Sequence, residues 1–264
     1  MSLLSKLLAI VAGCVGLLFS NMAHAAYQLN MIEGVTPMSV TQHGLHMTML
    51  WVVTGIGVIV FGVLLYAIVM HRKSRGVKPS DFHENIQIEV IWTVIPFIIL
   101  IVLAIPATRA LIMQENTSKA DMTIAVTGYQ WYWKYDYLGE DVSLTAHSST
   151  SQEQIDGLMP KSEHYLLEVD NVLVVPTHTK IRFTFTANDV LHAWWMPALG
   201  IKKDTVPGFI NEAWAYIDEP GIYRGQCAEL CGMHHGFMPI VVEAKSPEDY
   251  QAWLATQKTA KEKS

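Results

Sequence analysis

Apolar and polar side chains alternate without a break along Lys180-Ile181-Arg182-Phe183-Thr184-Phe185-Thr186. A period of two is typical of a strand that buries one face. Short runs rich in β-branched or aromatic residues recur around it, at residues 122–129, 131–137, 165–169, 212–217 and 238–244. Proline, glycine and asparagine separate these runs, so the second half of the chain is predicted to be an antiparallel β-sandwich or barrel.

Two other segments of this half differ from the strands. Residues 139–163 are polar and irregular, and we expect a long loop there. A helix is expected at the end, because Ser246 can cap it, Pro247 suits its first position, and Glu248 and Asp249 favour the positive end of the helix dipole.

Two long apolar runs precede the β-rich half. Residues 47–70 contain no charged side chain, and residues 90–108 form a second uncharged run, which predicts spans at about 47–70 and 90–112. A bilayer core requires about 20 apolar residues, so both runs are predicted to be transmembrane helices in a hairpin. Pro96 and Pro106 are compatible with this, because neighbouring helices can satisfy the carbonyls that they release.

The N-terminus is predicted to be a signal peptide. An apolar run at residues 3–19 is followed by Ala23-His24-Ala25, which predicts cleavage after Ala25. Two alternatives are a lipoprotein signal ending at Cys14 and an uncut segment that forms a third span. With cleavage, the domains are a signal peptide at 1–25, an N-terminal segment and hairpin at 26–114, and the β-rich domain at 115–264.

Basic residues set the predicted orientation. Arg72, Lys73, Arg75 and Lys78 lie between the two spans, whereas residues 26–46 contain no lysine or arginine. Positive loops stay in the cytoplasm, so the C-terminal domain is expected on the periplasmic side of a bacterial inner membrane.

The charge distribution restricts the partners. Residues 114–264 carry 20 acidic and 12 basic side chains, a net charge of −8, within a whole-chain net charge of −6. This acidic domain is unsuited to nucleic acid and fits a basic protein partner, whose association it would accelerate.

One segment concentrates metal-binding side chains: Cys227-Ala228-Glu229-Leu230-Cys231-Gly232-Met233-His234-His235-Gly236-Phe237-Met238. Thiolate, imidazole and thioether together suit copper. The residues alone leave four readings open: two coppers bridged by the cysteines, a blue-copper site, a zinc site and a disulfide. A second imidazole would have to come from elsewhere, and His192 after the alternating strand is the candidate.

These residues match a known family. The motif C-x-E-x-C-x3-H-x2-M at residues 227–238 closely resembles subunit II of haem-copper cytochrome c oxidase, and residues 89–93, 130–133 and 189–192 add to the resemblance. It covers nearly the whole mature chain. The fold it implies is two transmembrane helices followed by an all-β, cupredoxin-like Greek-key sandwich.

The resemblance also implies a binuclear copper A centre. Its ligands would be bridging Cys227 and Cys231, His192 and His235, and the weak donors Met238 and the backbone carbonyl of Glu229. The Glu229 side chain would join a magnesium site shared with subunit I, although an ordinary surface carboxylate is the alternative.

The implied function is oxidase activity in which this chain receives the electrons. Reduced cytochrome c would give electrons to the copper pair, and the pair would pass them to haem, held only in subunit I, for oxygen reduction coupled to proton pumping. Partners would be subunit I, the other oxidase subunits, cytochrome c and the lipid bilayer.

Further residues take roles by resemblance. Trp131 would receive the electron, with strand packing as the alternative, and Glu89 would lie at the entrance of a proton path, with a helix-start carboxylate as the alternative. The docking acids would be Asp136, Asp170, Asp189 and Asp204, each of which could instead be simply solvated.

The chain departs from the family at two positions and leaves one other function open. Phe209 stands where many relatives carry arginine, and Asn188 where some carry an acid. A quinol oxidase subunit is rejected because all the side-chain copper ligands are present, and nitrous oxide reductase because that protein is soluble and carries another metal domain. A membrane-anchored copper-binding or copper-delivery protein without redox turnover is the remaining alternative.

Overall fold

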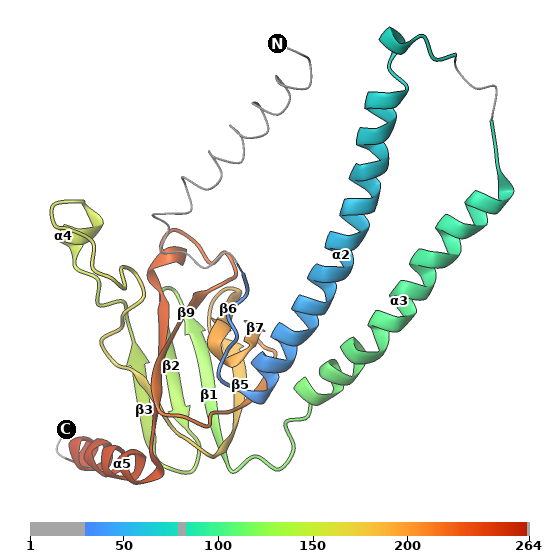
Figure 1. The fold of residues 1–264 in the computed structure, drawn as a ribbon. Helices are drawn as coiled ribbons and strands as arrows, with labels where there is room; N and C mark the ends of the chain where they lie inside the picture. The colour runs from blue at the N-terminus through green and yellow to red at the C-terminus, as the bar shows by residue number, and fades with distance from the viewer. Residues whose placement is uncertain (1–29, 79–82, 263–264) are drawn as a thin grey trace. The chain divides into compact units, whose positions relative to one another are not determined.

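The computed structural model describes residues 30–78 and 83–262 (Figure 1). The predicted signal peptide and the cleavage after Ala25 lie outside these residues. Two long helices come first, α2 (Pro37–Met70) and α3 (Ile86–Gln114), and windows within them reach mean hydropathies of 2.7 and 2.8. Both are long and apolar enough to cross a membrane, and they contain the two predicted spans.

Local capping explains where these helices begin. The Thr36 side chain accepts a hydrogen bond from the Ser39 backbone N–H at 3.0 Å, and Asn85 does the same for Ile88 at 3.2 Å. Such caps satisfy backbone donors that a helix leaves free. Pro96 and Pro106 lie inside α3 without ending it, as predicted for a helix that spans a membrane.

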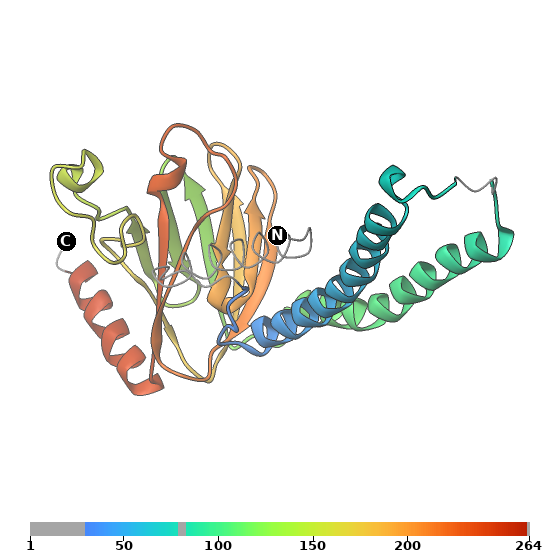
Figure 2. The same cartoon turned by 45° about the horizontal axis from the view of Figure 1, so that its top comes forward.

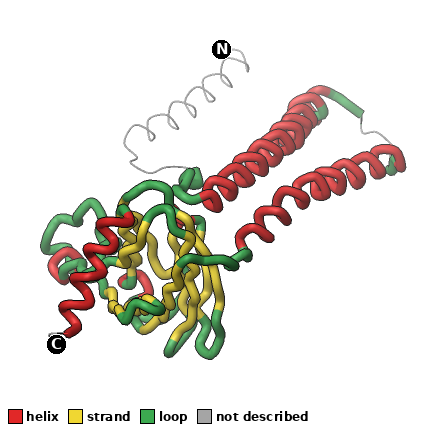
Figure 3. Tube along the Cα trace, turned by 90° about the horizontal axis from the view of Figure 1, so that it is seen from below, coloured by secondary structure: helices red, strands yellow, loops and turns green. Residues whose placement is uncertain are grey.

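The C-terminal domain consists of two five-stranded sheets, and the strands are gathered together in Figure 3. The first sheet has the order β3 (Val142–Ala146), β2 (Tyr132–Tyr137), β1 (Met122–Tyr129), β5 (Lys180–Ala187) and β8 (Asn211–Tyr216). The second has the order β4 (Leu173–Pro176), β10 (Pro239–Lys245), β9 (Gly221–Cys227), β6 (His192–Met196) and β7 (Ile201–Thr205).

The alternation predicted for β5 is confirmed. Ile181, Phe183 and Phe185 are fully buried, and the residues between them are only partly buried. In the neighbouring strand β1, Ile124 and Val126 lie in register with the two phenylalanines. Burying an aromatic or aliphatic side chain contributes about 1.5–3 kcal/mol, so this face holds the sandwich together.

Strand pairing differs from the prediction in two places. The sheets are not wholly antiparallel, because β1 pairs in parallel with β5 and β10 in parallel with β4. The strand predicted at residues 165–169 is wrong: a turn occupies residues 165–166, only Val169 forms an isolated bridge, with Ser148, and Leu166 has a φ of 61°, which interrupts an extended chain.

Other strands lacked a clear pattern in the sequence. The expected loop at 139–163 contains strand β3 and the short helix α4 (Gln152–Ile155). Strand β4 is buried on both faces and therefore does not alternate, and β9 is interrupted by Gly225.

The terminal helix is confirmed as α5 (Pro247–Glu262) (Figure 2). The Ser246 hydroxyl accepts a hydrogen bond from the Asp249 backbone N–H at 3.1 Å. Tyr250 and Leu254 are buried and join the core, so the helix packs its apolar side on the sandwich.

Candidate metal centre

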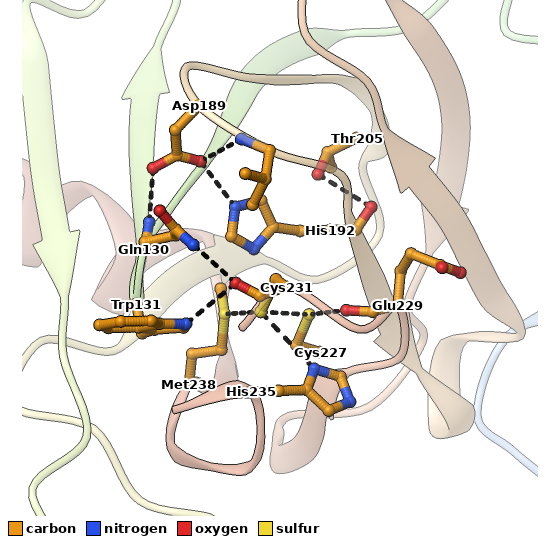
Figure 4. A network of polar contacts seen from close by, with 11 residues as sticks. Gln130, Trp131, Asp189, His192, Thr205, Cys227, Glu229, Cys231, His235 and Met238 are labelled. Atoms are coloured by element: carbon orange, nitrogen blue, oxygen red, sulfur yellow. Dashed lines mark hydrogen bonds and ion pairs between the residues drawn. The ribbon is translucent and has the colours of Figure 1, made fainter. Parts of the chain in front are cut away.

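The candidate ligands come from two adjacent strands and the loop between β9 and β10. His192 begins β6, and Cys227 ends β9. Cys231, His235 and Met238 follow on the loop (Figure 4). Because β6 and β9 are antiparallel neighbours, with Trp194 opposite Cys227, residues far apart in the sequence meet at one end of the sheet.

The sulfur atoms lie close together around Cys231. Its Sγ is 3.9 Å from the Cys227 Sγ, 3.4 Å from the Met238 Sδ and 3.6 Å from the His235 Nδ1. The Cys227 Sγ is also 3.3 Å from the backbone carbonyl oxygen of Glu229. A disulfide needs about 2.05 Å between sulfurs, and both residues are free cysteines, so this cluster presents separate thiols.

His192 has one ring nitrogen satisfied and one available. Its Nε2 lies 2.9 Å from the Asp189 carboxylate, where a ring N–H can donate to it. Within the described part of the chain, the buried Nδ1 has no hydrogen-bond partner, and Figure 4 shows this nitrogen turned toward the cysteines. Ligand atoms of His192, Cys227 and Cys231 all lie within 4.8 Å of one another.

These features fit a metal, because a buried polar atom without a partner is costly unless a ligand satisfies it. A histidine that holds a metal through one nitrogen typically donates its other N–H to a carboxylate, as His192 does to Asp189. The exposed fractions are 0% for His192, 4% for Cys227, 2% for Cys231 and 1% for Met238. Water is therefore excluded from most of the donor set.

The surroundings of the two thiols shift their pKa values in opposite directions. Burial raises the pKa of Cys227, but the adjacent His192 imidazole and hydrogen bonds with nearby backbone outweigh burial and lower it. Burial raises the pKa of Cys231, and the charge of Cys227 raises it further. The pair therefore favours one thiolate and one thiol before a metal binds.

The charge of that thiolate also acts on His192. Burial lowers the pKa of the His192 imidazole, but its contacts with Cys227 and Asp189 outweigh burial and raise it. Burial raises the pKa of Asp189, but hydrogen bonds from His192 and from the backbone N–H groups of Gln130 and Val190 lower it overall. Asp189 is thus held as a carboxylate behind the histidine.

Trp131 contacts the metal-binding loop directly. Its indole Nε1 donates to the backbone carbonyl of Cys231 at 3.2 Å, and the Gln130 side chain donates to the same oxygen at 2.8 Å. Trp131 is half-buried, whereas Trp133 is fully buried and donates to the carbonyl of Met238. Of the two tryptophans, Trp133 packs in the core and Trp131 reaches from the surface to the loop.

The structure also places the predicted acidic residues of the sandwich. The Glu229 side chain is exposed, and in Figure 4 its carboxylate points away from the sulfur atoms. Asp136 pairs with Lys134 at 2.8 Å. Asp170 accepts backbone hydrogen bonds at 2.7 Å from residues 147 and 171, and Asp204 is exposed.

Asp189 and Glu89 differ from these acids in their surroundings. The two carboxylate oxygens of Asp189 accept hydrogen bonds from His192 and from backbone N–H groups beside it. Asp189 therefore supports the candidate metal centre, and a docking role alone does not explain these contacts. Glu89 is partly buried in the first turn of α3, and its backbone N–H donates to the carbonyl of Asn85 at 3.0 Å.

Sequence reasoning missed two supporting residues. No role was predicted for Gln130, yet its side chain donates to the Cys231 carbonyl and its backbone N–H donates to Asp189. A Cβ on Gly128 would lie 2.8 Å from Cδ2 of His192, so only glycine leaves room for the ring. A glycine inside a strand is the signal that could have indicated this close approach.

Two family models match most of the chain. The family "Cytochrome C oxidase subunit II, transmembrane domain" matches residues 24–110, and "Cytochrome C oxidase subunit II, periplasmic domain" matches residues 122–245. The probable cytochrome c oxidase subunit 2 of Rickettsia conorii is 41% identical over 235 residues, which cover 89% of this chain and 73% of that protein. The chain belongs to the cytochrome c oxidase subunit II family.

Other relatives have the same description. Cytochrome c oxidase subunit 2 of Cereibacter sphaeroides is 33% identical over 267 residues, covering 92% of this chain and 88% of that protein. The crystal structure of the periplasmic domain of subunit II from Bradyrhizobium japonicum is 37% identical, covers 55% of this chain and 98% of that chain, and has a TM-score of 0.49. As a member of this family, the chain is a membrane-anchored protein with a cupredoxin-like domain, and the predicted fold class is confirmed.

Proposed function

We propose that this subunit II chain receives electrons for a cytochrome c oxidase at a binuclear copper A centre. The observation that carries the proposal is the buried Nδ1 of His192, which lacks a protein partner and faces two free thiols. Such an atom needs a metal or another ligand to satisfy it. Membership of the oxidase subunit II family supports copper as that metal.

Six donors would hold the two copper ions. Cys227 and Cys231 would bridge the ions, His192 and His235 would each bind one, and Met238 and the carbonyl of Glu229 would be weak donors. Soft sulfur with imidazole favours copper, whereas a zinc site of two cysteines and two histidines would leave the Met238 thioether unused. When bound, the copper pair supplies one-electron redox chemistry.

The protein would keep these ligands rigid so that little rearrangement accompanies the electron. Asp189 fixes one histidine, Trp133 and Gln130 fix the loop carbonyls, and the sulfur atoms are buried. Trp131 would receive the electron from reduced cytochrome c, because its indole extends from the surface to the Cys231 carbonyl. Haem and oxygen reduction would belong to subunit I, together with proton pumping.

Acidic residues would serve the partners. The net charge of −8 on residues 114–264 favours a basic cytochrome c, with Asp136, Asp170 and Asp204 as docking acids, and Asp189 contributing in addition to its support of His192. The exposed Glu229 carboxylate would help to hold magnesium shared with subunit I.

The membrane part would fix the orientation and a proton path. Glu89, at the start of α3, would lie at the cytoplasmic entrance of the proton path. The sandwich would face the periplasm of a bacterial inner membrane. Replacing Glu89 with glutamine should slow oxidase turnover without changing copper content; unchanged turnover would remove this role.

The test of the electron-receiving centre is spectroscopic. The full chain, with its thiols reduced, is loaded with copper in detergent and then oxidised by one electron with a mild oxidant; it should bind two coppers and give an electron paramagnetic resonance spectrum of one unpaired electron shared by both nuclei. His192→Ala should lose this spectrum, whereas His178→Ala, which changes an exposed histidine of the same domain, should keep it. One copper with a localised spectrum would refute the binuclear centre.

A further inference from the structure

Two exposed metal-binding side chains lie on the loop that covers the buried centre. Met233 is 79% exposed, the highest value among the large apolar side chains of the described residues, and His234 is also exposed. The sulfurs of Cys227, Cys231 and Met238 belong to side chains no more than 4% exposed. A metal ion that arrives from solvent would therefore meet donors on the loop before it reaches the thiols.

Ring contacts hold the His234 imidazole in position. Its ring meets Trp131 edge-on, with centroids 4.6 Å apart, and Phe237 in the same manner at 5.6 Å. Among the described residues, no protein group forms a hydrogen bond with either imidazole nitrogen of His234. The imidazole is thus placed by packing while its nitrogens stay available to a ligand.

We propose that Met233 and His234 form a capture pair for Cu(I), the site at which copper first binds on its way to the centre. This inference rests on the proposed copper centre. A thioether and an imidazole form a soft donor set that suits Cu(I) and holds it without the cost of a buried charge. His235, the next residue along the chain, contacts Cys231 through Nδ1 at 3.6 Å, so the pair adjoins the centre through the chain itself.

The transfer is a ligand exchange that conserves oxidation state. The bonds from Cu(I) to the Met233 sulfur and the His234 imidazole break as bonds to the Cys231 sulfur and the His235 imidazole form, and the thiol proton of Cys231 goes to solvent. Copper stays Cu(I) throughout, so no oxidant is required, and a second ion follows the same route to give the fully reduced pair.

An exposed apolar side chain could instead serve only as a contact for another protein. Leu230, on the same loop, is 76% exposed and has no metal-binding atom. Met233→Leu separates the two roles, because it keeps an apolar side chain of similar volume and removes only the sulfur. His234→Asn removes the imidazole and keeps a polar side chain.

The experiment follows Cu(I) uptake by the full chain in detergent, reduced and free of metal. Cu(I) is supplied from a chelator buffer, and the copper-thiolate absorbance is recorded with time. The chain with both Met233→Leu and His234→Asn should load about tenfold more slowly, as expected when supporting ligands are lost, yet reach the same final spectrum. Met159→Leu, at a methionine 53% exposed in another segment, is the matched control and should load at the unaltered rate.

A second experiment measures Cu(I) binding by the capture pair in a chain that lacks the two cysteines of the centre. A chain carrying Cys227→Ser and Cys231→Ser should still bind one Cu(I) in competition with a coloured chelator, and adding the two loop substitutions should weaken it about tenfold. Equal loading rates and equal affinities would overturn the capture pair while leaving the centre intact. Failure of the unaltered chain to form a two-copper spectrum would instead refute the proposed function, and the second experiment would still decide whether the loop binds Cu(I).

Discussion

Replacing Asp189 with asparagine tests whether this residue supports the metal centre. One carboxylate oxygen accepts from the His192 Nε2 at 2.9 Å and the Val190 N–H at 2.7 Å, and the other accepts from the Gln130 N–H at 2.7 Å. An amide offers only one oxygen, so at least one of these donors must lose its acceptor. A hydrogen bond to a charged group contributes about 1.5–3 kcal/mol, so we expect Asp189→Asn to destabilise the metal-free sandwich by about 2 kcal/mol.

The same substitution should weaken copper binding. Loss of a carboxylate behind a metal-binding histidine typically lowers affinity about 10- to 100-fold. Unfolding by urea, followed by tryptophan fluorescence, measures the first effect, and competition with a copper chelator measures the second. Asp204→Asn is the control, because it removes the same charge from an exposed residue.

The control also separates support from docking. If Asp189 acts only in docking, both variants would change the salt dependence of cytochrome c oxidation, and neither would change stability or copper affinity. A free energy of unfolding for Asp189→Asn within about 0.5 kcal/mol of the unaltered chain, as for an ordinary surface change, would refute the supporting role.

Three further outcomes are expected. Gly128→Ala places a Cβ 2.8 Å from Cδ2 of His192, so thermal unfolding should show a loss of about 1–3 kcal/mol, and an unchanged melting temperature would contradict this packing. Trp131→Phe should slow electron transfer from reduced cytochrome c in stopped-flow measurements with copper content unchanged; equal rates would assign the indole to packing. The hydrogen bond from Arg182 lowers the pKa of the Glu212 carboxyl below its ordinary value of 4.5. The pair should therefore stabilise the domain fully at pH values above 4.5, and this stabilisation should be lost as the pH falls through the lowered pKa. Glu212→Gln should therefore reduce this loss in urea titrations at acidic pH, and an identical pH profile would exclude the pair as its source.

Much of the fold could be predicted because it depends on local pattern. Long uncharged runs predict membrane helices wherever they occur, and the alternation at residues 180–186 gives a strand with one buried face. Serine followed by proline at 246–247 indicates a helix start for the same local reason. Strands β4 and β9 were missed because their residues are buried on both faces or interrupted by glycine, and local pattern then carries little information.

The candidate metal donors at residues 227–238 were evident from the sequence by itself, since the C-x-E-x-C-x3-H-x2-M motif places soft ligands within one short segment. The motif could not show that Asp189 turns inward to His192, that Gln130 binds the Cys231 carbonyl, or that Gly128 makes room for the histidine ring. Pairing of β6 with β9, and of β1 with β5, brings these residues together from distant parts of the chain. Residue type and spacing determine which atoms can bind a metal, whereas their mutual distances depend on long-range strand pairing, and only the tertiary structure decides that.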